Sequence, residues 1–142
     1  MACTGANPVA LTDGLNFGNP QFPNVFWQFD EAVRGIAEAA ETMETPVISG
    51  NVSFYNESDL GSVPPTPLIG ALGVLEDKSK FIGEHPRGGE GFLILLSVPT
   101  SDEHQGLGAS AYAAFVHGIE NGYPIAPSIA GERKLCDLLV KS

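Results

Sequence analysis

Hydrophobic residues recur at helical spacing between residues 24 and 43. The apolar positions of this stretch are Phe26, Phe29, Val33, Ile36, Ala40 and Met43. Steps of three and four residues place them on one face of an α-helix. Asn24 is expected to cap the N-terminus of this helix, and Pro46 is expected to end it near Met43. The pattern therefore predicts one long helix that packs this apolar face against a sheet.

Short apolar runs on either side of the helix predict strands. They cover residues 8–11, 46–50, 52–55, 68–76 and 91–99, with a turn expected between the second and third runs. Residues 68–76 are apolar at both odd and even positions, which is typical of a strand buried on both faces. Helical patterning returns at residues 107–119 and 128–141. The order β-α-β-β, then β-α-α, indicates an α+β fold with layered α and β elements.

A polar, glycine-rich segment, residues 78–90, separates these two groups of elements. We interpret it as a junction between a partial first domain, residues 1–77, and the start of a second domain, residues 91–142. A total of 142 residues fits one domain or slightly more.

Composition excludes several classes of function. The net charge is −10, which opposes binding to nucleic acid. There is neither a run of 18 apolar residues nor a signal peptide, so the sequence predicts neither a membrane protein nor an exported one. Cys3 and Cys136 are interpreted as reduced thiols of a cytoplasmic protein. His85, His104 and His117 lack the spacing of metal ligands.

Two polar clusters follow apolar runs, at residues 11–20 and 49–58. Ligand sites gather at strand ends in such sheets. Asp13, Asn51 and Glu57 offer hard oxygen atoms suited to Mg²⁺. Gly50 would let the backbone approach a ligand, and the hydroxyl of Ser53 can donate to a phosphate or an amide.

A purely structural interpretation of both clusters is also open. Asp13 and Gly14 form a common turn pair, Asn51 could complete a hairpin turn, and Ser53 could be an ordinary edge-strand hydroxyl. The sequence has no glycine-rich dinucleotide motif, no Walker A motif and no nucleophile elbow. From the residues alone, an oxygen-rich anion or metal site and a pair of turns remain alternatives.

Four segments occur in the sequence in this order: ALTDGLNFGNPQFP, WQFDEAVRGIAEA, TPVISGNVSFYNES and PTPLIGALGVLED. Together, from about Asn7 to Asp77, they resemble the large synthetase subunit of the phosphoribosylformylglycinamidine synthases. The motifs NFGNP and SGNVSxYNE at this separation are specific to that family. Residues 78–142 agree with it only in general layout. The resemblance implies the second A-type domain of an aminoimidazole-ribonucleotide-synthetase-like fold, followed by the start of a B-type domain, as a fragment of a longer chain.

This resemblance implies a ligase of purine biosynthesis that converts formylglycinamide ribonucleotide, ATP and ammonia to formylglycinamidine ribonucleotide. A glutaminase subunit or domain would supply the ammonia, and a small accessory subunit is a possible further partner. By similarity, Asp13 and Gly50 would contact ATP, Asn51 would bind Mg²⁺, and Ser53 would contact the ribonucleotide. No catalytic residue is carried over, because the family's catalytic histidine lies in a half that this sequence does not match.

Three functional hypotheses follow. The chain could contribute to a working synthetase site, or it could hold a structural nucleotide that never turns over. It could also belong to another member of the same ATP-using superfamily. In each case the isolated fragment is expected to be inactive.

Overall fold

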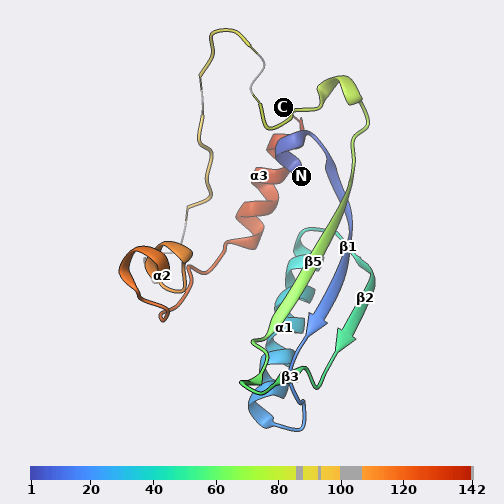
Figure 1. Cartoon of the computed structure of the whole chain (residues 1–142). Helices are drawn as coiled ribbons and strands as arrows, with labels where there is room; N and C mark the ends of the chain where they lie inside the picture. Colours follow the sequence, from blue (N-terminus) through green and yellow to red (C-terminus); the bar gives the residue numbers. More distant parts are fainter. Residues whose placement is uncertain (86–87, 93, 100–106, 142) are drawn as a thin grey trace.

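The computed structural model describes residues 1–85, 88–92, 94–99 and 107–141 (Figure 1). The chain begins with a short 3-10 helix, η1. The elements are, in order, η1 (Ala2–Thr4), β1 (Asn7–Asn16), α1 (Pro23–Thr42), β2 (Val47–Ser53), β3 (Glu57–Ser58), β4 (Gly61–Ser62), β5 (Thr66–Val74), η2 (Lys78–Lys80), α2 (Ala111–His117) and α3 (Ile129–Lys141). This mixture of helices and strands confirms the predicted α+β class.

A three-stranded sheet in the order β2-β1-β5 forms the centre of the first half. β1 runs parallel to β2 and antiparallel to β5. The parallel connection from β1 to β2 passes through α1, as a crossover between parallel strands requires. β3 and β4 form a separate two-stranded ribbon between β2 and β5. The strands β1 and β2 therefore lie side by side, although α1 separates them in the sequence.

Helix α1 begins one residue before the predicted cap. Pro23 is its first residue, where the missing N–H of proline costs no hydrogen bond. The N-cap is Phe22, and it makes no side-chain capping bond, so the prediction that Asn24 is the cap was wrong. Met43 is the C-cap, which confirms the predicted end of the helix.

The core lies between α1 and one face of the sheet. Leu15, Phe17 and Val25 are its buried residues, and Phe29, Ala32, Ile36 and Phe54 pack against them. Phe26 and Val33 are exposed, so the predicted helix face was only half right. The apolar surface of α1 is broad enough for two overlapping stripes. The stripe that packs is the one that meets the rings of Phe17 and Phe54.

Four strand predictions were wrong in detail. β1 does not end at residue 11 but continues to Asn16, and β2 runs through residues 47–53 without the expected turn. β5 is present but is largely exposed instead of buried on both faces. The described residues of the 91–99 run form no strand. Within the described ranges no strand lies beside this run to accept its hydrogen bonds, and Phe92 and Leu95 are more than nine-tenths exposed.

The two later helices confirm the helical patterning of the second half. α2 is shorter than predicted, whereas α3 covers nearly the whole predicted stretch. α3 lies beside η1 and also contacts α1 (Figure 1). No helix in the described part of the chain is both long and apolar enough to cross a membrane.

Candidate functional site

The register of β1 and β2 brings the two polar clusters together. Asp13 lies opposite Gly50, Gly14 lies opposite Asn51, and Asn16 lies opposite Ser53. These pairs come from segments 37 residues apart in the sequence. The pairing of β1 with β2 thus places the two polar clusters on neighbouring strands.

The turn interpretation of these residues was wrong. Asp13 and Gly14 lie inside β1 and are paired on both sides. On β2 their partners are Gly50 and Asn51, and on β5 the partner of Asp13 is Ile69. Asn51 lies within β2 and completes no hairpin. A turn pair can stay extended here because two neighbouring strands satisfy its backbone groups.

The side chains of Asp13 and Asn51 point to opposite faces of the sheet. Side chains alternate along a strand, so Asp13 shares a face with Leu15, which is buried against α1. Asn51 and Ser53 lie on the other face, where Asn51 is exposed and Ser53 is half-buried. Within the described residues β2 is one of the two edge strands of this sheet. A ligand at this edge could therefore reach both faces.

Gly50 is explained by its neighbour Asp13. A Cβ atom added at Gly50 would overlap a carboxylate oxygen of Asp13 and would lie 2.8 Å from its Cγ. The absence of a side chain at Gly50 is therefore what lets the carboxylate of Asp13 lie over β2. The sequence predicts that this glycine lets a ligand approach the backbone, and the structure adds a second reason for it, the space that Asp13 occupies.

Hydrogen bonds hold the two strands in this register. On the face opposite α1, Ser49 Oγ donates to Thr12 Oγ1 over 2.8 Å. Beyond the strand ends, Phe17 N donates to the carbonyl of Ser53, and Tyr55 N donates to the carbonyl of Gly18. The geometry around Asn51 and Ser53 is thus fixed from both ends.

The donor set suits a hard cation but does not surround one. Asp13 and Asn51 supply the oxygen chemistry that Mg²⁺ prefers. Among the described residues, no three His, Cys, Asp or Glu side chains come together in a metal-binding group. A cation at Asn51 would therefore need phosphate oxygens, water or other protein groups to complete its ligand shell. His85 and His117 are exposed, as expected of solvated surface residues, whereas His104 lies outside the described ranges.

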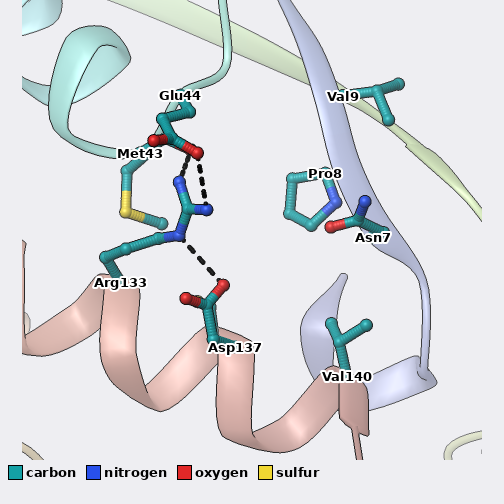
Figure 2. A pocket seen from close by; sticks show the side chains of 9 residues that line it. Asn7, Pro8, Val9, Met43, Glu44, Arg133, Asp137 and Val140 are labelled. Atoms are coloured by element: carbon teal, nitrogen blue, oxygen red, sulfur yellow. Dashed lines mark hydrogen bonds and ion pairs between the residues drawn. The ribbon is translucent and has the colours of Figure 1, made fainter.

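A second cluster, which the sequence did not suggest, lies where α3 meets the end of α1 (Figure 2). Arg133 donates to Asp137 and Glu44 over 2.9 Å each, and also to the carbonyl of Met43. The bonds to Asp137 and Glu44 raise the pKa of Arg133. A cavity of about 260 Å³ beside it is lined in part by Cys136. This cluster caps α1 and attaches α3 to it.

Comparison with known proteins gives consistent matches. The family described as AIR synthase related protein, N-terminal domain, matches residues 1–75. The subunit PurL of phosphoribosylformylglycinamidine synthase from Alkaliphilus metalliredigens is 45% identical over 122 residues, which are 86% of this chain and 16% of that protein. The same subunit from Moorella thermoacetica is 47% identical over 133 residues, which are 94% of this chain and 18% of that one.

A solved structure of Thermotoga maritima PurL complexed with ATP is also similar. It is 35% identical, with a TM-score of 0.46, over 51% of this chain and 12% of that chain. This chain thus spans less than a fifth of the length of the relatives that it matches.

Proposed function

Because this chain belongs to the family of AIR synthase related proteins, we propose that it forms part of an ATP-dependent synthetase of purine biosynthesis. The reaction proposed for the complete protein joins ammonia to formylglycinamide ribonucleotide and gives formylglycinamidine ribonucleotide, ADP and phosphate. The 45% and 47% identity to PurL subunits supports this ligase over other members of the superfamily.

The observation that carries the proposal is the pairing of β1 with β2. Asp13 lies opposite Gly50, and Asn51 and Ser53 follow on the same strand. The resemblance gives these four residues the roles of ATP, magnesium and substrate contacts. These four residues come from two segments that are distant in the sequence. The pairing of β1 with β2 brings those segments together beside the exposed edge strand β2.

Each residue is proposed to act through its own polar group. The carboxylate of Asp13, with the backbone of Gly50, would hold ATP at the edge of β2. The side-chain oxygen of Asn51 would hold Mg²⁺, and Ser53 would contact the ribonucleotide. When bound, Mg²⁺ neutralises phosphate charge, which favours transfer of the γ-phosphoryl group to the substrate's amide oxygen. Ammonia then attacks the activated carbon, and phosphate leaves with that oxygen.

The proposed partners follow from the same reaction. A glutaminase subunit or domain would supply ammonia, a small accessory subunit could join them, and the remainder of the chain would complete the site. The net charge of −10 supports a protein that binds no nucleic acid, and we place the enzyme in the cytoplasm, away from membranes. The division at residues 78–90 between an A-type and a B-type domain is kept as part of this proposal.

Replacing Asn51 in the complete protein tests the proposed metal role. Asn51→Leu keeps the size of the side chain and removes its oxygen, at an exposed position where the fold should tolerate the change. The Mg²⁺ concentration needed for half-maximal turnover should rise by at least about tenfold, as it does when a metal's ligand shell is weakened. Turnover and ATP affinity are measured against Mg²⁺ concentration.

The matched control is Asn121→Leu, the same substitution at an exposed loop residue. It should leave the Mg²⁺ dependence unchanged. If Asn51→Leu also behaves like the parent protein, Asn51 binds no metal.

Nucleotide exchange tests the alternative that this half holds a structural nucleotide that never turns over. Labelled ATP should replace bound nucleotide within a catalytic cycle, whereas a structural nucleotide would be retained through purification.

A further inference from the structure

Asn56 joins the ends of the two strands that carry the proposed site. Its Nδ2 donates to the carbonyl of Ser53 over 2.9 Å and to the carbonyl of Phe17 over 3.1 Å. Its backbone N donates to the same Phe17 carbonyl over 3.2 Å, and its own carbonyl accepts from Val63 N. One half-buried side chain thus holds the residue after β1 against the last residue of β2.

These contacts fix the orientation of the Asn56 amide group. A backbone carbonyl can only accept a hydrogen bond, so the side of the amide that faces two carbonyls must be its NH₂ group. The Oδ1 atom therefore faces the other way, towards Ser53 Oγ at 3.3 Å. Since Oδ1 can only accept, the hydroxyl proton of Ser53 must be the one that is donated.

We propose that Asn56 is a positioning residue that commits the hydroxyl proton of Ser53 and so presents Ser53 Oγ to the ligand as an acceptor. This inference rests on the proposed function, because it concerns the same ribonucleotide contact. The group of the ligand that meets Ser53 is then a hydrogen-bond donor, such as an amide N–H or a ribose hydroxyl. An unprotonated phosphate oxygen, which only accepts, meets other groups.

The backbone next to Asn56 shows that this arrangement is held against local preference. Tyr55 has a φ of 59°, in the left-handed region that a bulky residue rarely occupies. The bonds from Tyr55 N and Asn56 N to the segment after β1 hold this conformation. Such strain is found where a structure must aim a side chain, and here it places the Asn56 amide between the two strand ends.

A double-mutant cycle in the complete protein tests the proposal, with formylglycinamide ribonucleotide as the varied substrate. Asn56→Ala should raise the KM for the ribonucleotide roughly fivefold to tenfold, the loss expected for one hydrogen bond. The KM for ATP should change less than about twofold, within the scatter of independent sites. In a Ser53→Ala background, Asn56→Ala should cause no further rise, because the hydroxyl that it orients is gone.

The proton assignment has its own readout. Sulfate, a dianion whose oxygens only accept hydrogen bonds, is used as a competitor of the ribonucleotide, and its inhibition constant should be the same in Ser53→Ala and in the parent. Ser53→Thr keeps the hydroxyl and should restore the KM of the parent. Ser58→Ala, at an exposed serine of the short strand β3, is the matched control and should change neither constant.

The outcomes separate the two proposals. If Asn56→Ala raises the KM equally with and without the Ser53 hydroxyl, Asn56 only supports the fold and the inference is wrong. Weaker sulfate inhibition in Ser53→Ala would overturn the assignment of the proton. If the parent protein itself does not use formylglycinamide ribonucleotide, the proposed function fails instead. Should Asn56→Ala not fold, Asn56→Ser, which can still donate to one carbonyl, replaces it in the same cycle.

Discussion

Incubated with ATP, ammonia and formylglycinamide ribonucleotide, the 142-residue chain alone is expected to release no ADP above background. Asp13 on the central strand β1 and Asn51 on the edge strand β2 point to opposite faces of the sheet, and the described residues contain no group of three metal-binding side chains. A nucleotide and its cation would keep most of their water there, so charge developing in the transition state would remain unstabilised. Steady-state ADP release by the purified chain measures this.

The complete protein, assayed under the same conditions, is the positive control for this experiment. Its turnover shows that substrates and buffer are competent. Sustained ADP release by the 142-residue chain, dependent on the ribonucleotide, would contradict the proposal that the rest of the protein supplies the missing groups.

Phe29→Ala is expected to destabilise the chain by about 3 kcal/mol, the low end for removal of a phenylalanine ring from a core. The low end applies because Phe29 is only partly buried. Its ring makes edge-to-face contacts with Phe17 at 5.4 Å and with Phe54 at 5.0 Å between centroids. Truncation would leave both rings facing a cavity between α1 and the sheet. The free energy of unfolding is measured by urea denaturation.

Phe26→Ala is the matched control on the same helix. Phe26 is 55% exposed, and its ring lies 6.4 Å from that of Phe29 without entering the core. Its loss should cost less than about 1 kcal/mol, as is usual at surface positions that keep one aromatic neighbour. Equal losses for the two variants would mean that the other face of α1 packs against the sheet.

The helices were largely predictable because their signal is local. Spacing and a proline placed α1 to within a residue or two, and patterning found α3. The choice between Val25 and Phe26 for the core was not predictable, because it depends on where Phe17 and Phe54 lie. Those rings belong to segments before and after α1 in the sequence.

The strands were less predictable than the helices, because their extent depends on pairing with distant segments. Asp13–Gly14 has the local signature of a turn, and only pairing with β2 and β5 keeps it extended. The same pairing explains Gly50, whose missing side chain makes room for the carboxylate of Asp13. The residues of the candidate site were named from a resemblance, whereas the role of Asn56 required hydrogen bonds that no sequence pattern reveals.

The exposed apolar surface of β5 and of residues 91, 92 and 94–99 affects how this chain behaves as a colloid. Leu68 and Leu72 on β5 are more than half exposed, and an open strand edge of this kind is a template for pairing with another copy. The net charge of −10 opposes such contact by mutual repulsion. That repulsion acts over about 10 Å in 0.1 M salt and only about 3 Å in 1 M salt. Ionic strength therefore sets the balance between dispersed and self-associated chains, and low salt favours the dispersed form.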